Sequence, residues 1–370
     1  MLGDMGAEII KVEPQVGEAL RLYTYINPSL QSMLSLLHRN KKGITVNLQT
    51  KEGQQIIKKL VEKMDILVEN FTPGVMEKFG LGYNVLKEIN PRLIYTSISG
   101  FGRTGPYSRR TAFDMIAQAM GGIMHAIQQE DGPPKLFIAD MLGGIFGALG
   151  TLIALHYRER TGKGQLVDIS MQDIMFALNL KAHLQDQITD ERLKKLGKSS
   201  LLDIRLPLYN SYKTRDGHIA IVALTDRQWR RMCDIMGRPQ LKRDRRFLNG
   251  YRRLKNIDEL DAIVTEWTRT LPTDKIFNIL NEHKIPCGKV LNFEQVRNDP
   301  QIIARNMIEE IDTEKFGKIK VPGILIKLSE SPGSIYSPAP ELGEHNQEIL
   351  MKYCQLSKTE IHELKKKGII

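Results

Sequence analysis

The chain has 370 residues and carries 53 Lys and Arg against 43 Asp and Glu, so its formal net charge is +10. Its length exceeds one compact core and suits two domains, while 41% hydrophobic and 26% charged residues exclude wholesale disorder. The basic residues are spread widely and are not interleaved with aromatics, which argues against a nucleic-acid partner and leaves a small polyanionic ligand to explain the charge.

Helix and strand signals alternate through the first hundred residues. Residues 7–13 and 43–48 alternate as strands, and residues 65–68 and 93–99 predict two more. This order predicts a parallel sheet with helices on both faces, whose ligands gather at the carboxyl ends of the strands. Two of those ends are residues 69–71 and the glycine loop 100–106. The first helix between these strands begins at Thr50, and its apolar face consists of Ile56, Ile57, Leu60, Val61 and Met64. The second is predicted to have Thr72 as its N-cap and Pro73 at its first position.

Two apolar stretches, 112–126 and 141–157, predict buried helices, the second ending at Gly162. A strand at 165–170 and a helix from Met171 follow. Beyond residue 200 the pattern changes to a hairpin, 208–214 with 219–224, and then to polar helices until about residue 284. The sequence therefore predicts a large domain at 1–202, a small α+β domain at 203–310, and a C-terminal segment at 311–370.

Asp140 is an isolated acid among apolar residues and glycines, at the start of the second apolar helix. A buried carboxylate without partners costs several kcal/mol, so the chain has a use for it. By itself the local sequence favours a structural explanation, in which Asp140 caps the helix. The alternative is a nucleophile or a base.

Other motifs carry less information. The loop from Gly100 to Gly105 lacks the Gly-Lys-Ser/Thr ending of a P-loop and is either a phosphate cradle or a plain turn. Arg39, Lys41 and Lys42 suit either phosphate contact or a solvated face. No catalytic Ser/His/Asp set and no His or Cys pair with metal spacing is present.

The expected setting is the cytoplasm, with no membrane partner. Three widely spaced cysteines, Cys233, Cys287 and Cys354, argue for a reducing compartment without a disulfide framework. The first residues do not form a signal peptide, and no apolar stretch reaches the length of a membrane span.

Taken together, the segments resemble the family III CoA-transferases (the CaiB/BaiF group), which include formyl-CoA transferase and carnitine CoA-transferase. The matching motifs occur in the family's order and span almost the whole chain. They are residues 3–13, 40–44, 68–74, 99–106, 138–140, 160–165, 285–288 and 342–345.

The resemblance implies that Asp140 is a covalent nucleophile. The ionised carboxylate attacks an acyl-CoA thioester to give an aspartyl anhydride, an aspartyl-CoA thioester follows, and CoA leaves on a small acceptor carboxylic acid. Gly143 and Gly144 leave room for substrate, and backbone amides hold the oxyanion. No metal and no tightly bound cofactor are implied, because coenzyme A is a substrate.

The resemblance also implies the CoA contacts and the architecture. The contacts carried over by match are Val46, Asn70, Phe71, Thr72, Lys78 and Arg110. The fold is a doubly wound, Rossmann-like large domain with a smaller α+β domain, in an interlocked, ring-like homodimer. Compared with the family, the chain begins inside the first helix, so the usual first strand and part of the CoA site are expected to be missing.

Two further hypotheses about function stay open. Related α-methylacyl-CoA racemases use a histidine where this chain has Phe113, which cannot move a proton, so racemisation or epimerisation of an acyl-CoA is the second choice. A non-catalytic CoA- or nucleic-acid-binding protein is the third. The donor and acceptor acids and the pathway are not legible in the sequence.

Overall fold

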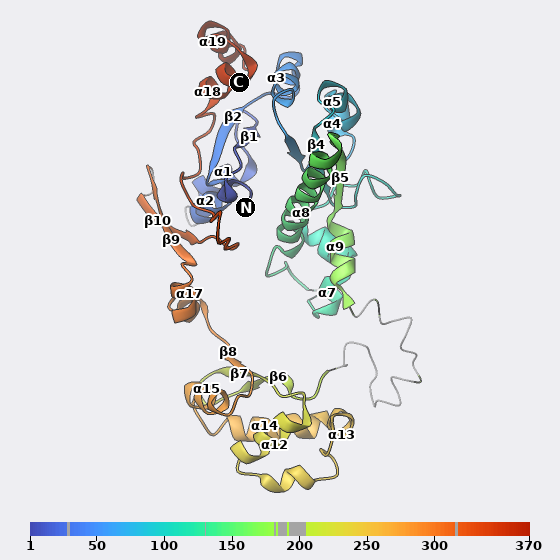
Figure 1. Ribbon diagram of the computed structural model, residues 1–370, viewed down its shortest axis with the longest axis vertical. Helices are drawn as coiled ribbons and strands as arrows, with labels where there is room; N and C mark the ends of the chain where they lie inside the picture. Colours follow the sequence, from blue (N-terminus) through green and yellow to red (C-terminus); the bar gives the residue numbers. More distant parts are fainter. Residues whose placement is uncertain (28–29, 130, 181–182, 184–190, 192–204, 315–316) are drawn as a thin grey trace. The chain divides into compact units, whose positions relative to one another are not determined.

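Two compact units make up the chain (Figure 1). The computed structural model describes residues 1–27, 30–129, 131–180, 183, 191, 205–314 and 317–370. Unit 1 comprises Met1–Asn179 and Pro300–Ile370, and unit 2 comprises Leu180–Asp299. The junction expected at residues 202 and 203 lies outside the described residues.

Unit 1 contains parallel strands, as the alternating pattern predicts. β1 (Ile9–Glu13) pairs with β2 (Lys41–Thr45), while β3 (Ile66–Glu69), β4 (Ile94–Ser99) and β5 (Leu166–Ser170) form a second parallel sheet in the order β3-β4-β5. No hydrogen-bonded ladder joins these two sheets in the described part of the chain. The expected single sheet is therefore divided in two. A separate antiparallel pair consists of β9 (Ile308–Thr313) and β10 (Gly317–Pro322).

Helices connect these strands and supply the C-terminal end of unit 1. Their bounds are η1 (Gly3–Met5), α1 (Ala19–Ile26), α2 (Gln31–His38), α3 (Lys51–Val61), α4 (Val75–Lys78), α5 (Tyr83–Ile89), α6 (Asp114–Met120), α7 (Ile123–Ala126), α8 (Ile138–Thr161), α9 (Met171–Leu178), α17 (Pro300–Ala304), α18 (Asn346–Cys354) and α19 (Lys358–Lys366).

The predicted helix starts were right in one case and wrong in the other. The Thr50 hydroxyl accepts a hydrogen bond from the Gly53 N–H at 3.1 Å and caps α3, as the sequence predicts. Thr72 does not cap α4, because that helix begins two residues after Pro73. Gly74 is its N-cap in the left-handed region, with φ +97°, and its N–H donates to Glu77.

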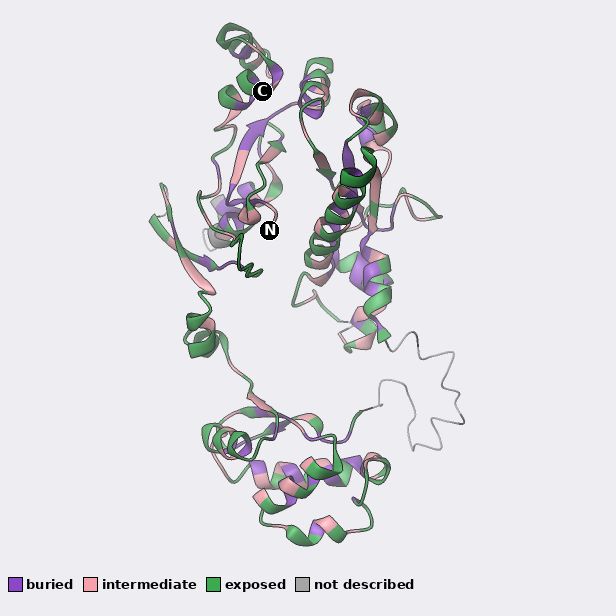
Figure 2. Cartoon of the chain, in the orientation of Figure 1, coloured by how far each residue is buried: buried purple, intermediate pink, exposed green. Residues whose placement is uncertain are grey.

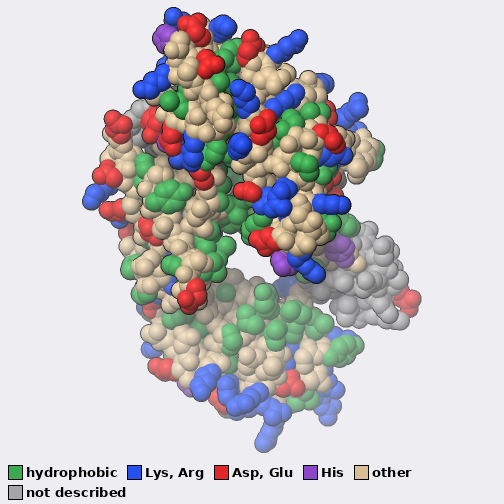
Figure 3. Space-filling view, turned by 45° about the horizontal axis from the view of Figure 1, so that its top comes forward, with side chains coloured by type: hydrophobic (Ala, Val, Ile, Leu, Met, Phe, Trp, Pro, Cys, Tyr) green, Lys and Arg blue, Asp and Glu red, His purple; other side chains and the backbone are tan. Residues whose placement is uncertain are grey.

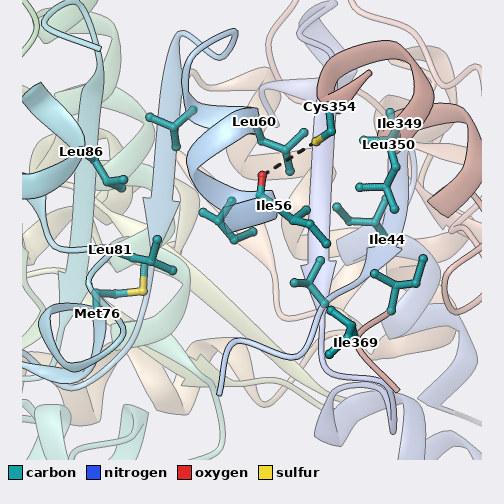
Figure 4. Close-up of a cluster of buried hydrophobic side chains, with 14 of the residues drawn as sticks. Ile44, Ile56, Leu60, Met76, Leu81, Leu86, Ile349, Leu350, Cys354 and Ile369 are labelled. Atoms are coloured by element: carbon teal, nitrogen blue, oxygen red, sulfur yellow. Dashed lines mark hydrogen bonds between the residues drawn. The ribbon is translucent and has the colours of Figure 1, made fainter. Parts of the chain in front are cut away.

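One apolar core joins the two parallel sheets of unit 1 (Figure 4). Ile56 and Leu60 of α3 lie beside Ile44 of β2 and beside Ile349 and Leu350 of α18. The same core reaches β4 and α5, so the C-terminal helices complete a core that the first hundred residues begin. Its fully buried members include Ile44, Leu81, Leu86, Tyr95, Ile349 and Leu350.

α8 packs on β4 and β5 through its small residues. Gly147 faces Ile98, Gly150 faces Val167, and the Thr151 hydroxyl lies 2.6 Å from the Thr96 hydroxyl. Gly162 ends the helix with φ +76°, as predicted. The prediction of a buried helix was wrong for the other side, because Met141, Ile145, Leu149 and Ile153 are exposed (Figure 2).

The 24 residues of α8 are also long and apolar enough to cross a membrane, which corrects the expectation that no such stretch exists. Length and composition are the only basis for that assignment. The glycine face of α8 lies against a parallel sheet, which explains the apolar composition of that side by packing.

Unit 2 contains both helices and strands. β6 (Tyr209–Lys213) and β7 (His218–Val222) form the expected hairpin, and β8 (Cys287–Lys289) extends it. Its core surrounds Trp229, Phe247 and Leu260. Figure 3 shows Lys and Arg side chains gathered on one edge of this unit. Its helices are α12 (Asp226–Ile235), η4 (Pro239–Arg243), α13 (Gly250–Lys255), α14 (Ile257–Thr268), α15 (Thr273–Glu282) and α16 (Phe293–Arg297).

Two glycines of α8 provide a matched test of this packing. A Cβ at Gly150 would lie 2.7 Å from Val167 Cγ1, whereas a Cβ at Gly144 would meet nothing within 4 Å. We expect Gly150→Ala to destabilise unit 1 by about 1–3 kcal/mol through overpacking. Gly144→Ala should stabilise it by up to about 1 kcal/mol through helix propensity. Urea unfolding of the full chain measures both, and equal effects would contradict the close approach of α8 to β5.

Candidate functional site

Asp140 lies in the first turn of α8, at the carboxyl edge of the β3-β4-β5 sheet. The other end of α8 marks the opposite edge, because Arg158 donates to the carbonyls of Asp65 and Arg92, which precede β3 and β4. Gly143, one turn after Asp140, contacts Ile98 near the end of β4. Asp140 therefore lies at the edge where parallel sheets bind ligands.

Asp140 does not cap its own helix. The N-cap residue is Phe137, whose side chain makes no capping bond. Asp114 of α6 supplies the cap instead, and its Oδ1 accepts the N–H groups of Ala139 at 2.8 Å and of Asp140 at 3.1 Å. The structural explanation favoured by the local sequence is thereby removed.

Gln118 completes this arrangement. Its side-chain amide donates to Asp114 Oδ2 at 2.6 Å and to the Leu136 carbonyl at 2.8 Å. Asp114 and Gln118 are both buried, so they fix the backbone on either side of Phe137. The backbone N–H groups of Ala139 and Asp140 already donate to Asp114. They are therefore not available to stabilise the oxyanion, a role that the family resemblance gave to backbone amides.

The carboxylate of Asp140 accepts no hydrogen bond from the described residues, and the residue is exposed, which corrects the expectation of a buried acid. Partial loss of hydration, and then the negative charge of Asp114, raise the pKa of Asp140 above the ordinary carboxyl value. A carboxylate with a raised pKa and no hydrogen-bond donor among the described residues, at the ligand-binding edge of a sheet, is a candidate functional group.

The residues that follow the C-terminus of β3 are also hydrogen-bonded at the carboxyl edge of the sheet. The Asn70 amide donates to the Ile98 carbonyl at 2.6 Å, and the Ile98 side chain contacts α8 at Gly143 and Gly147. Phe71 is exposed beside it, while the buried carboxylate of Glu69 accepts the Phe71 N–H at 2.8 Å. Burial raises the pKa of Glu69. The structure thus brings Asn70 and Phe71 to the strand edge that α8 covers.

Arg103 holds the glycine loop in place. Its guanidinium pairs with Glu77 and lies 3.7 Å from Glu69, and its backbone N–H donates to Asp168. These carboxylates make the loop around Gly102 unsuited to cradling phosphate, and they favour the plain turn of the two readings.

The other sequence candidates fall into three groups. Lys78 is exposed and has no acidic partner among the residues that the structure describes. Arg110 is exposed and stacks 4.0 Å from the Tyr107 ring centre, and Thr72 is partly exposed, so all three are accessible to a ligand. Val46 is a correction, because its side chain is 1% exposed and belongs to the core. Gly143 is another correction, because it packs against Ile98 and Met171. Gly144 faces open space, as expected.

The sequence reasoning placed Glu69 and Arg103 only within candidate strand ends, and it missed the role of Asp114. Asp114 directly follows Phe113 at the start of α6, a position that the motif comparison singled out only for Phe113. An acid in the first turn of one helix gives no sign that it caps another helix 25 residues later in the chain.

Comparisons with known proteins agree on one family. The sequence model of CoA-transferase family III matches residues 1–346. A succinyl-CoA–D-citramalate CoA-transferase of Chloroflexus aurantiacus is 36% identical over 378 residues, covering 100% of this chain and 93% of that protein. A formyl-CoA:oxalate CoA-transferase of Streptomyces coelicolor is 32% identical, with 100% and 94% covered.

Solved structures show the same likeness. Rv3272 from Mycobacterium tuberculosis superposes with a TM-score of 0.82 at 27% identity, covering 94% of this chain and 92% of that one. A CAIB/BAIF family protein from Brucella suis gives a TM-score of 0.76 at 31% identity, with 95% and 93% covered.

Asp140 in α8 and Asp114 in α6, which caps α8, should respond oppositely to removal of their charge. The raised pKa of Asp140 means that its ionised form costs stability, and this cost appears as the pH rises through that pKa. We expect Asp140→Asn to raise the melting temperature at pH 7, with a gain that shrinks as the pH falls toward about 4. Asp114→Asn should lower it by the equivalent of about 1–2 kcal/mol through the weakened cap. Calorimetry across this pH range measures both, and a stabilising Asp114→Asn would contradict the capping role.

Proposed function

Because the chain belongs to the family III CoA-transferases, we propose that it moves CoA from an acyl-CoA thioester to an acceptor carboxylic acid through Asp140. The observation that carries the proposal is the Asp140 carboxylate at the strand edge, which has no hydrogen-bond or ion-pair partner among the described residues because Asp114 caps α8 instead. A nucleophile free of competing hydrogen bonds, on a backbone held in place, supports this role.

The proposed reaction begins when Asp140 attacks the thioester carbonyl. The carbon–sulfur bond breaks, and the products are an aspartyl anhydride and CoA thiolate. The thiolate then attacks the aspartyl carbonyl, which releases the donor acid and leaves an aspartyl-CoA thioester. The acceptor carboxylate attacks this thioester, the carbon–sulfur bond breaks, and a second anhydride and CoA thiolate form. The thiolate then attacks the acceptor acyl carbonyl, which gives the new acyl-CoA and releases the carboxylate of Asp140.

The chain's own residues support this sequence of steps in specific ways. Asp114 and Gln118 hold the backbone that carries Asp140, which limits the region that its carboxylate can reach. Gly144, one turn along, leaves open space beside it. The raised pKa of Asp140 makes its ionised form more basic and hence a better nucleophile once deprotonated.

Asn70, Phe71, Thr72, Lys78 and Arg110 are the proposed CoA contacts. Phe71 offers an exposed ring to the adenine, and Lys78 and Arg110 offer positive charge to the phosphates. Coenzyme A is the substrate, and the cytoplasm is the proposed setting. The named relatives transfer CoA from succinyl-CoA or formyl-CoA, which makes these two thioesters the first donors to test.

We expect Asp140→Ala to abolish acyl-CoA:carboxylate exchange, because the covalent intermediates cannot form. The measurement combines succinyl-CoA and formyl-CoA with a panel of carboxylic acids, with mass spectrometry of the intact protein during turnover. An acyl or CoA adduct should map to Asp140 in the native protein. Full activity in the variant would sink the assignment.

Two further measurements distinguish the transferase from the other two hypotheses. A racemase would exchange the α-proton of the acyl group into deuterated water, which a transferase should not do, and Phe113 offers no group for that step. A nucleic-acid binder would show binding to DNA or RNA that falls steeply with salt.

Lys78→Met should raise the KM for acyl-CoA roughly tenfold while leaving kcat unchanged, because a phosphate contact far from the thioester contributes uniform binding. Lys63, an exposed lysine just after the C-terminus of α3, provides the matched control. Lys63→Met should leave KM and kcat unchanged. A fall in kcat alone would contradict the phosphate role.

The homodimer implied by the resemblance would occupy the open side of α8. Leu149, Leu152 and Ile153 are each at least 49% exposed there, which forms an apolar face that another chain can cover. We expect Leu149→Lys to convert a dimer to monomers in sedimentation experiments. An unchanged dimer would place the interface elsewhere.

A further inference from the structure

Far from Asp140 in the sequence, one lysine of the 39–42 basic run has no partner. Arg39 pairs with Asp4 at 3.0 Å, and Lys42 pairs with Glu8 at 3.1 Å and also with Glu348. Lys41 Nζ has neither an ion pair nor a hydrogen bond among the described residues. Its side chain is partly buried, and burial followed by the positive charge of Lys11 lowers the pKa of Lys41.

The charges around Lys41 leave it unmatched. Three carboxylates act on it, and each is already held by another cation: Asp4 by Arg39, Glu13 by Arg21 at 2.8 Å, and Glu18 by Lys11 at 2.8 Å. Burial also lowers the pKa of His38, which favours the neutral ring, so His38 supplies no charge that could balance Lys41. The group therefore carries one cation in excess, and a partly buried cation without a counterion is costly.

A cavity of about 450 Å³ opens beside Lys41. Its apolar walls come from Ile9 of β1 and from residues 338–340 of the C-terminal segment, and Lys42 and His345 line it as well. Asn40 fixes that segment, because its side chain donates to the Ser334 carbonyl and accepts the N–H groups of Tyr336 and Ser337. The cavity wall is thus held in place by hydrogen bonds from the buried residue Asn40.

We propose that this cavity binds a small monocarboxylate whose charge pairs with Lys41. The apolar walls suit a short hydrocarbon chain, and a cavity of this size holds a small organic acid. Glu8 and Glu344 also line it and oppose a second negative charge, which favours a monoanion over a dianion. The site lies at the start of β1 and β2, and it stands independently of the transfer reaction at Asp140.

The test uses calorimetric titration of the full chain with butyrate, its neutral isostere butyramide, and inorganic phosphate. The protein carries Asp140→Ala and no CoA is added, so turnover cannot contribute. We expect butyrate to bind and butyramide not to bind. Lys41→Met should weaken butyrate roughly tenfold to hundredfold, Lys41→Arg should retain most of the affinity, and Lys42→Met should have the smaller effect because its charge is already paired.

A second measurement locates the site. Hydrogen exchange should show that butyrate protects the peptide covering residues 334–345, and that Lys41→Met removes this protection. The proposal is overturned if butyramide binds as well as butyrate, if phosphate binds more tightly, if Lys41→Met and Lys42→Met weaken butyrate equally, or if no carboxylate binds. Since none of these outcomes involves CoA transfer, failure here leaves the proposal for Asp140 intact.

Discussion

The carboxylate of Asp114 is the interaction on which the arrangement of the proposed site depends. It accepts the first free N–H groups of α8 across the gap between two helices, and Gln118 holds it in that position. A helix start needs an acceptor for these amides. Since Asp114 provides it, Asp140 is released from a structural duty and is left as an unpaired charge in the first turn. Partial burial, and then the negative charge that caps the helix, raise the pKa of Asp140, so Asp114 affects both the placement of Asp140 and its acidity.

α8 serves the site and the fold with different faces. Its glycines let the helix approach β4 and β5 closely, which sets Asp140 at the carboxyl edge of the sheet. Its larger apolar residues point away from the sheet and remain exposed. The apolar character of this segment therefore reflects two surfaces, one used within unit 1 and one offered to a partner, and this accounts for a composition that also fits a membrane span.

Several arginines of unit 1 are committed to internal structure. Arg21, Arg39 and Arg103 pair with acids of unit 1, and Arg158 is buried against the carbonyls that precede β3 and β4. Lys78 and Lys41 have no acidic partner among the described residues, and both are proposed ligand contacts. Lys78 is one of the proposed CoA contacts and Lys41 lines the cavity at the start of β1 and β2, so net charge alone does not identify either site.

The sequence by itself determined the parallel strands, the start of α3, the end of α8, the hairpin of unit 2 and the family, because period, caps and motif order are local or linear properties. It also pointed to Asp140. Only the tertiary structure decided that Asp114 caps α8, that Val46 and Gly143 are packing residues, and that Lys41 lacks a counterion. Each of these depends on which groups from distant segments come within hydrogen-bonding or van der Waals distance, and residue spacing along the chain does not encode that distance.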